Sequence, residues 1–553
     1  MKLTGAQIVI EVLAEQGVDT IFGYPGGSVL PIYEELYHQE HRIRHILTAD
    51  EQGAAFAADG YARATDRVGV CMATSGPGAT NLVTGIASAF MDSVPMVAIT
   101  GNVPTGLIGQ DSFQEVYIAG ITLPITKHNF YVTDVNQLAG TLRKAFAIAQ
   151  SGRKGPVLVD IPKDISTATA EYEPEPSQTN TYRTKIIPAQ IEEAARLINQ
   201  AKRPVIYCGG GVTASCAGAE LAELAKKADI PVTHTLMAAG VMGYGERLNL
   251  GMLGMHGWVA ANQAIAEADL VLAIGTRFSD RVAQNRRTFA GKAKILQIDI
   301  DPSEVNKNVQ VDYSILGDVK DVLTALLPKI NKRRHPGWMK MIEGWKQEDY
   351  HPVDSEEVLK PHQIIGMIGE MTGEEAIYTT DVGQHQMWTA QYLKHLTACN
   401  FLTSGGLGAM GYGYGAAIGA KLAKPEKPVI HITGDGSFHM NLTEACTAVS
   451  YKLPIITVIM NNSVLGMVRQ LQTYFNNSLF MATEPERETD FVKVAEGFGC
   501  IGYRAATPAE FREVYAKALN AERPVWIDCI VDREERVLPM IPPGKGVESV
   551  IMH

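Results

Sequence analysis

The sequence has no apolar run of the roughly 18 residues that a membrane-spanning helix requires. Even the apolar segment LPIITVIM stops at Asn461. The N-terminal segment MKLTGAQIVIEVLAEQG has the pattern of an amphipathic helix, without the separate apolar core and cleavage site of a signal peptide. We therefore expect no membrane association and a cytoplasmic location.

Clustered positive charge is also missing. The 49 Lys and Arg residues face 60 Asp and Glu residues, for a net charge of −11, and no basic stripe occurs. Because phosphate backbones are bound by clustered cations, we expect no nucleic-acid partner. The seven cysteines are scattered and never have CxxC spacing, which favours reduced core thiols over disulfides or a zinc site.

Repeats of the solenoid kind are absent, yet 553 residues are too many for one core, since domains rarely exceed about 250 to 300 residues. Apolar strands alternate with helical patterns, which predicts parallel sheets wrapped by helices. The predicted fold class is α/β, with three doubly wound parallel-sheet domains. Two polar, proline-containing segments are predicted to be linkers, and the second, near residues 331–357, is expected to connect domains rather than pack into a core. The predicted divisions are residues 1–170, a linker at 171–188, 189–330, a linker at 331–357, 358–535 and a C-terminal tail at 536–553.

Two motifs of the third block carry the strongest chemical signal. Asp435 lies in a GDGS turn after the apolar strand KPVIHIT, and Asn462 follows the next strand, LPIITVIM. Both should emerge at the carboxyl ends of neighbouring parallel strands, where ligands bind in such sheets. Their side-chain oxygens and the backbone carbonyl of Val464 suit Mg²⁺. Each pattern alone is equally typical of a turn or a helix cap, but together they resemble the motif of thiamine-diphosphate enzymes.

Such enzymes need a carboxylic acid for the aminopyrimidine ring of the coenzyme. In the first block, Glu51 opens the helix that follows the strand IRHILTA, and a glycine turn, TSGPGATN, follows the next strand. An acid at a helix start is commonly explained by the helix dipole. Here the arrangement resembles the pyrimidine-binding domain of the thiamine family, which makes Glu51 the predicted catalytic acid.

The resemblance extends over nearly the whole chain and is most specific for acetohydroxyacid synthase catalytic subunits. The segments that carry it are FGYPGGSVLP, DEQGAAFAADGYARAT, IGQDSFQE, ITKHNF, LGMLGMHG, GTRFSDRV, TSGGLGAMGYG, GDGSFHMN, NNSVLGMVRQLQ and VLPMIPPGKG. It implies a pyrimidine-binding domain, an FAD-binding-like central domain and a diphosphate-binding domain. It also implies thiamine diphosphate, Mg²⁺ and FAD as cofactors.

Individual site residues follow from the same resemblance. Met410 would be the apolar wedge beneath the coenzyme, although a lone Met more often fills a gap in a core. Lys127 would line the site, although it is equally interpretable as a solvated surface charge. The other predicted first-domain residues are Gly27 and Gln114 for catalysis and Phe113 for substrate. The predicted coenzyme contacts are Gln384, His385, Gly408, Met410, Gly434, Gly436, Ser437 and Met467.

The central block contains a strand that runs into the glycine triplet Gly209, Gly210 and Gly211, which by resemblance would bind FAD in a structural role. A glycine triplet alone is weak evidence. Arg277 could clamp the planar carboxylate of the second keto acid through two parallel hydrogen bonds. Its alternatives are an FAD phosphate contact or a structural ion pair.

The implied reaction decarboxylates pyruvate and joins the two-carbon unit to a second 2-keto acid, in branched-chain amino-acid synthesis. Leu471 stands where most of the family has Trp, which predicts only weak preference for 2-ketobutyrate over pyruvate as acceptor. The resemblance also implies a homodimer or homotetramer, with a possible small regulatory subunit. Rival interpretations are an FAD-free catabolic acetolactate synthase, a pyruvate oxidase, a decarboxylase, or a catalytically silent scaffold subunit.

Overall fold

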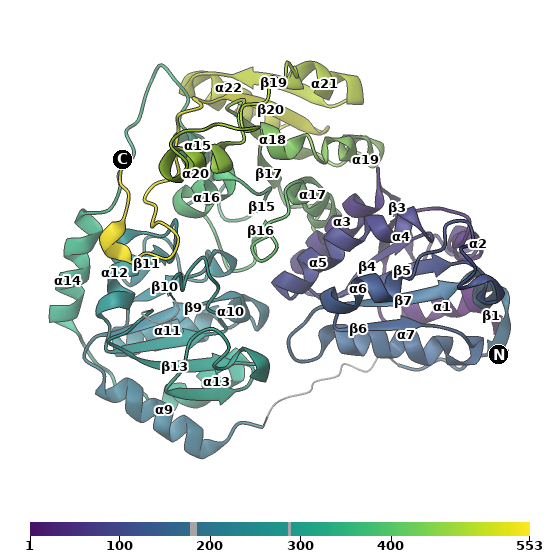
Figure 1. Cartoon of the computed structure of the whole chain (residues 1–553), viewed down its shortest axis with the longest axis horizontal. Coiled ribbons are helices and arrows are strands. Elements are labelled where there is room, and N and C mark those ends of the chain that lie inside the picture. Colours follow the sequence, from purple (N-terminus) through teal and green to yellow (C-terminus); the bar gives the residue numbers. More distant parts are fainter. Residues whose placement is uncertain (177–184, 286–288) are drawn as a thin grey trace.

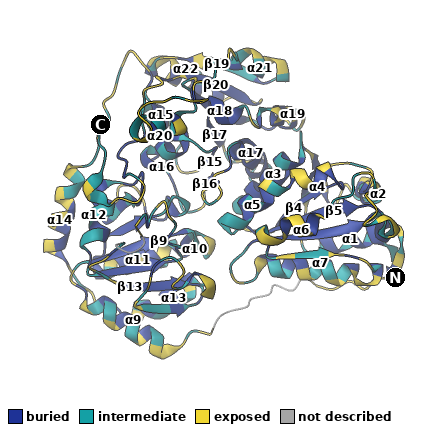
Figure 2. Cartoon of the chain, viewed as in Figure 1, coloured by how far each residue is buried: buried dark blue, intermediate teal, exposed yellow. Residues whose placement is uncertain are grey.

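The structure, a computed structural model of the chain, describes residues 1–176, 185–285 and 289–553. Three six-stranded parallel sheets, each flanked by helices, form three α/β domains (Figure 1). This confirms the predicted fold class. The central strands of each sheet are buried along nearly their whole length, as expected for parallel sheets covered on both faces (Figure 2).

The first domain has the sheet order β3-β2-β4-β5-β7-β6. The predicted N-terminal helix is preceded by a short strand, β1, which pairs with β8 in a separate antiparallel ribbon. The strands are β1 (Lys2–Thr4), β2 (Thr20–Tyr24), β3 (Arg44–Leu47), β4 (Gly69–Ala73), β5 (Met96–Asn102), β6 (His128–Tyr131), β7 (Pro156–Pro162) and β8 (Thr169–Glu171). The helices are α1 (Gly5–Glu15), α2 (Leu30–His38), α3 (Glu51–Thr65), α4 (Pro77–Asn81), α5 (Val83–Asp92), α6 (Ile118–Thr122), α7 (Val135–Gln150) and α8 (Lys163–Thr167).

The third domain repeats this topology. Its order is β16-β15-β17-β18-β20-β19, so both domains arrange six successive parallel strands as 2-1-3-4-6-5. The first and third domains are therefore structural relatives. The strands are β15 (Ile377–Thr380), β16 (Phe401–Thr403), β17 (Val429–Gly434), β18 (Ile455–Asn461), β19 (Ile501–Ala505) and β20 (Val525–Ile530). The helices are α15 (Pro361–Thr372), α16 (Gln384–Tyr392), α17 (Tyr412–Ala423), α18 (Asp435–Phe438), α19 (Ala445–Ser450), α20 (Gly466–Phe475), α21 (Phe491–Phe498) and α22 (Pro508–Leu519).

The central domain differs in its order, β11-β10-β9-β12-β13-β14, which is the 3-2-1-4-5-6 arrangement of dinucleotide-binding sheets. Its switch point lies between β9 and β12. The strands are β9 (Pro204–Cys208), β10 (Val232–His234), β11 (Asn249–Met252), β12 (Leu270–Ile274), β13 (Lys294–Asp299) and β14 (Tyr313–Leu316). The helices are α9 (Pro188–Gln200), α10 (Gly210–Ala214), α11 (Gly218–Ala228), α12 (Val259–Glu267), α13 (Val319–Leu326) and α14 (Pro336–Gln347).

One linker expectation was wrong. The segment 331–357 contains α14, whose Trp338, Met339 and Ile342 are buried in the core of the central domain. Pro336 stands in the first turn of this helix, where its missing N–H is unneeded, so the proline starts the helix instead of breaking it. Of the other predicted linker, 171–188, residues 177–184 lie outside the described residues.

The first and third domains meet through helices α3 and α17, which Figure 1 shows side by side. Their backbones approach closely at glycines. A Cβ on Gly60 would lie 2.2 Å from the carbonyl oxygen of Ala416, and one on Gly419 would lie 1.9 Å from that of Ala57. Only glycine permits this approach, which buries the whole contact.

Two further expectations concern cysteines and membranes. All seven cysteines are free, and four of them are buried. Within the described ranges, no helix combines the length and apolar character that a membrane crossing would demand.

Candidate functional site

The predicted metal ligands come together at the carboxyl edge of the third sheet. Asp435 follows β17 and Asn462 follows its neighbour β18. The main-chain N–H of Asn462 lies close enough to the Asp435 carboxylate to favour its charged form, and Val464 N donates to Asn462 Oδ1 at 3.2 Å. Burial raises the pKa of Asp435 to about 6, which a bound cation would reverse.

Gln384 and His385 begin α16 beside these ligands. Gln384 Oε1 accepts from Asn462 Nδ2 at 3.2 Å. His385 is 4% exposed, and its ring packs against Gly434, where a Cβ would lie 2.9 Å from Nδ1. Its Nε2 has no hydrogen-bond partner among the described residues, and burial lowers its pKa to about 4. A buried, unpaired ring nitrogen beside a cation site suits a ligand oxygen.

The loop between β16 and α17 contains Met410 and is tied to the GDGS turn, because Gly411 N donates to Ser437 Oγ at 3.1 Å. Gly408 and Gly411 adopt φ values of 74° and 84°, which side chains with a Cβ rarely adopt. Met410 is half-buried at this loop. The three other predicted contacts lie on the same edge: Gly434, Gly436 and Met467.

Glu51 occupies the predicted junction, as the first residue of α3, and is 8% exposed. Asn81 Nδ2 donates to Glu51 Oε2 at 2.9 Å. A Cβ on Gly78 would lie 3.0 Å from Glu51 Oε1, so this turn leaves no room for a side chain beside the carboxylate. Glu444 of the third domain accepts from the main-chain N–H of Ala49 at 3.1 Å, just before the helix.

The remaining first-domain predictions divide into two groups. Gln114 lies against the same glycine turn, since a Cβ on Gly76 would be 2.9 Å from the Gln114 Cα. Phe113 is 87% exposed. Gly27 follows β2, and a Cβ there would meet nothing within 4 Å. These positions lie at the carboxyl edge around the switch point of the first sheet.

Lys127 belongs to the second group. Its ammonium donates to the carbonyl oxygens of Ile148 and Ser151 at the C-terminal end of α7. Burial lowers its pKa to about 8. These contacts resemble a helix C-cap, so its proposed part in the site stays a prediction.

The glycine triplet of the central domain is explained largely by packing. A Cβ on Gly209 would lie 2.4 Å from the carbonyl oxygen of Gly275, and one on Gly211 would lie 2.6 Å from the Gly275 Cα. Gly210 faces the Met237 side chain, 3.3 Å from where its Cβ would lie. The triplet brings the start of α10 against the end of β12, at the switch point of this sheet.

Two arginines of the GTRFSDRV segment lie in different surroundings. Arg277 is near the charges of Arg153, Asp92 and Glu304, and burial lowers its pKa. Arg281 has a side chain that is 71% exposed, and its Nη1 lies 3.9 Å from the sulfur of Met255. Met255 belongs to the cluster against which Leu471 packs. The sequence prediction named Arg277 and did not consider Arg281, although the same segment contains both.

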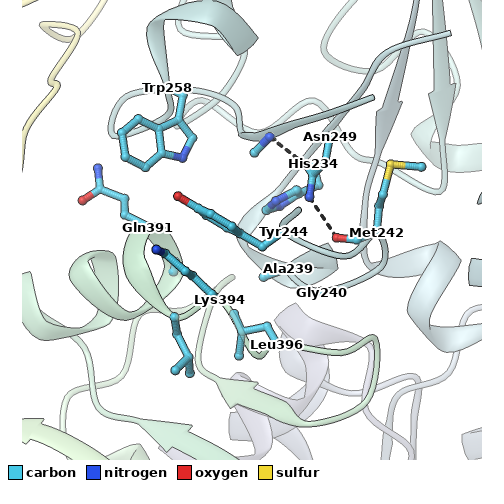
Figure 3. Close-up of a pocket in the computed structure, with 13 residues that line it drawn as sticks. His234, Ala239, Gly240, Met242, Tyr244, Asn249, Trp258, Gln391, Lys394 and Leu396 are labelled. Carbon is cyan, nitrogen blue, oxygen red and sulfur yellow. Dashed lines mark hydrogen bonds between the residues drawn. The ribbon is translucent and has the colours of Figure 1, made fainter. Parts of the chain in front are cut away.

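A small cavity of about 30 Å³ lies between the central and third domains, away from these residues (Figure 3). Its walls include His234, Tyr244, Trp258 and Lys394. The Lys394 ammonium lies 5.6 Å from the centre of the Tyr244 ring. This volume holds about one water molecule, so we do not regard the cavity as a substrate site.

Comparison with known proteins identifies all three domains. Residues 3–121 match the thiamine pyrophosphate enzyme N-terminal TPP binding domain, 191–326 the central domain and 381–529 the C-terminal TPP binding domain. The chain is 46% identical to an acetolactate synthase of Mycobacterium bovis, covering 99% of this chain and 91% of the relative. It is 44% identical to the acetolactate synthase isozyme 1 large subunit of Escherichia coli K12, covering 100% and 98%. The chain therefore belongs to the thiamine pyrophosphate (thiamine diphosphate) enzymes and, within them, to the acetolactate synthase large-subunit family.

Proposed function

We propose that this chain catalyses the formation of 2-acetolactate from two molecules of pyruvate, with thiamine diphosphate and Mg²⁺ as cofactors. The observation that carries the proposal is the presence of two half-sites, which by the family resemblance would meet between the first domain of one subunit and the third domain of another. Glu51 lies at the carboxyl edge of one sheet, and Asp435, Asn462 and Gln384 lie at the corresponding edge of a sheet with the same topology.

The third domain would hold the diphosphate end of the coenzyme. Asp435, the Asn462 side-chain oxygen and the Val464 carbonyl would bind the cation, whose other positions go to diphosphate oxygens and water. The unpaired Nε2 of His385 would face the same group. Bound there, thiamine diphosphate supplies a nucleophilic carbon and an electron sink for decarboxylation.

The first domain would supply the acid that exchanges a proton with the coenzyme. Glu51 is buried, and the Asn81 amide fixes one carboxylate oxygen, so the other can hold or deliver a proton at the aminopyrimidine ring. Gln114 lies beside the same turn and would hydrogen-bond the reacting oxygens. Phe113 and Gly27 would border the substrate space, and Met410 would support the coenzyme from below.

For the acceptor keto acid we propose an arginine of the GTRFSDRV segment. The guanidinium would clamp its carboxylate through two hydrogen bonds. Arg277 is the prediction from the sequence. Arg281 is the more exposed of the two and lies beside the Leu471 cluster, so variants of both are needed to assign this role.

FAD is proposed for the central domain in a structural role. The 3-2-1-4-5-6 strand order supports a dinucleotide at the switch point. Gln297 Oε1 is buried in β13 without a hydrogen-bond partner among the described residues, and it fits a polar ligand. A flavin absorbance spectrum of the purified protein tests this proposal, and a colourless preparation that gains no activity from added FAD would contradict it.

The active assembly is proposed to be a homodimer or homotetramer, with a possible small regulatory subunit. The first domain exposes Phe113, Tyr117 and Leu123 at 87%, 75% and 70%, which a second copy would cover. The seven free cysteines suit a reducing compartment, and we place the enzyme in the cytoplasm. Sedimentation velocity tests the assembly, and a monomer that retains full activity would contradict it.

The central experiment incubates the protein with pyruvate, Mg²⁺ and thiamine diphosphate, with and without FAD, and measures 2-acetolactate and carbon dioxide. Glu51→Gln should lower acetolactate formation by about 100-fold or more, the contribution of a positioned acid or base. Glu40→Gln, the same change at an exposed residue, is the matched control. Acetaldehyde release without acetolactate would identify a decarboxylase, and flavin reduction at the turnover rate would identify an oxidase.

A further inference from the structure

The first domain holds the Met410 loop of the same chain through a buried ion network. The Asp92 carboxylate, at the end of α5, accepts from the main-chain N–H groups of Gly406 at 2.7 Å and Gly405 at 3.1 Å. Arg63 Nη2 donates to the same carboxylate at 2.9 Å, while its Nη1 donates to the Thr403 carbonyl oxygen at 3.1 Å. Two residues of one domain thus bind three main-chain groups at the start of the loop.

The far end of the loop, at Tyr412, is held by α3, the helix that also contains Arg63. Asp59, on α3, accepts from Arg63 Nε at 2.7 Å and from the Tyr412 hydroxyl at 2.5 Å. The Arg63 guanidinium also lies 5.6 Å from the centre of the Tyr412 ring. The side chains of Asp59 and Asp92 are 0% exposed and that of Arg63 is 13% exposed, so solvent screens these contacts little.

We propose that Arg63 and Asp92 are positioning residues that hold the Met410 loop in the position that thiamine diphosphate binding requires, an inference that rests on the proposed function. Met410 lies between the two anchored ends of this loop. The start of the loop binds groups on α3 and α5, its end binds groups on α3, and α3 begins with Glu51. The helix that begins with the proposed acid therefore also fixes the Met410 loop of its own chain.

The chemistry of Asp92 makes this testable with an almost isosteric change. Its two oxygens accept from three donors: Arg63, Gly405 and Gly406. The amide of Asp92→Asn offers a single acceptor oxygen, and its NH₂ group faces another donor. At least one loop contact is therefore lost without any change in volume. Arg63→Lys keeps the charge but cannot reach Asp59, Asp92 and Thr403 together.

The test measures thiamine diphosphate binding by calorimetry in the presence of Mg²⁺, which requires no turnover. We expect Asp92→Asn and Arg63→Lys to weaken binding by up to about 100-fold, the size of effect that a displacement near 1 Å has on catalysis. Both variants should also lower the melting temperature of the cofactor-free protein, because each breaks a buried ion network, so binding is compared well below the unfolding transition. Excess coenzyme should restore kcat. The matched controls are Asp19→Asn and Arg67→Gln, which alter an exposed Asp–Arg pair next to α3 and should bind like wild type.

Wild-type binding in both network variants would overturn the proposal, as would a fall in melting temperature with an unchanged binding constant. If Asp92→Asn does not fold, Arg63→Lys decides alone. Failure of the proposed function has a different signature, since the wild-type protein itself would then bind no thiamine diphosphate or form no acetolactate.

Discussion

Alanine at Gly60 or Gly419 should force α3 and α17 apart and destabilise the contact between the first and third domains. The new Cβ would lie 2.2 Å from the Ala416 carbonyl oxygen in the first case and 1.9 Å from that of Ala57 in the second. The atoms met are main-chain atoms, which cannot rotate away. Overpacking of this kind costs about 1–3 kcal/mol, and the gain in helix propensity returns about 1 kcal/mol. A net loss of up to about 2 kcal/mol is expected for each variant.

Thermal unfolding of the purified protein measures this effect. The matched control is Gly140→Ala on the exposed side of α7, where a Cβ meets nothing within 4 Å. There the same substitution should stabilise the protein by about 0.5–1 kcal/mol, because only the propensity acts. If Gly60→Ala and Gly419→Ala melt as high as Gly140→Ala, the close helix crossing is not a feature of the folded protein and the reasoning fails.

Three other predictions concern charge and specificity. Burial raises the pKa of Glu444 from 4.5 to about 7 in the folded protein, so the folded state binds this proton more tightly than the unfolded chain does. The resulting contribution to the free energy of unfolding is full below pH 4.5 and is lost as the pH rises through 7. Glu444→Gln should remove up to about 3 kcal/mol of this pH dependence in urea unfolding between pH 5 and 8; an unchanged slope would contradict it. Leu471→Trp should raise selectivity for 2-ketobutyrate over pyruvate by about 1–3 kcal/mol in direct competition, and unaltered product ratios would refute it. Arg281→Lys should raise the KM of the acceptor keto acid more than Arg277→Lys does. A larger KM increase in Arg277→Lys would instead assign binding of the acceptor carboxylate to Arg277.

The residue positions that the sequence predicts correctly are those in which a strand leads directly into a polar turn. Asp435, Asn462 and Glu51 each follow an apolar strand within a few residues. Parallel strands carry such turns to one edge of the sheet, so local patterns were enough to bring Asp435 and Asn462 together. Proline patterns were less informative, since Pro336 begins a buried helix where we expected a connector.

Contacts between domains are the parts that could not be predicted. Arg63 and the Thr403 carbonyl are 340 positions apart, and Glu444 and Ala49 are 395 apart. Neither helical periodicity nor a motif indicates which helices of different domains will cross. Arg281 illustrates the same limit at short range, because its surroundings depend on Met255 and the C-terminal tail and not on its own segment.

The repeated topology gives the α3–α17 contact a further meaning. Each helix follows the second strand of its sheet, β3 in the first domain and β16 in the third, so the two are equivalent elements of related domains. Glu51 at the start of one helix and the Met410 loop before the other are therefore equivalent positions that have acquired different chemistry. Because equivalent helices pack face to face through small residues on both sides, a change at their crossing must alter both half-sites together. Gly60→Ala should for this reason weaken thiamine diphosphate binding as well as stability, whereas Gly140→Ala should leave binding unchanged.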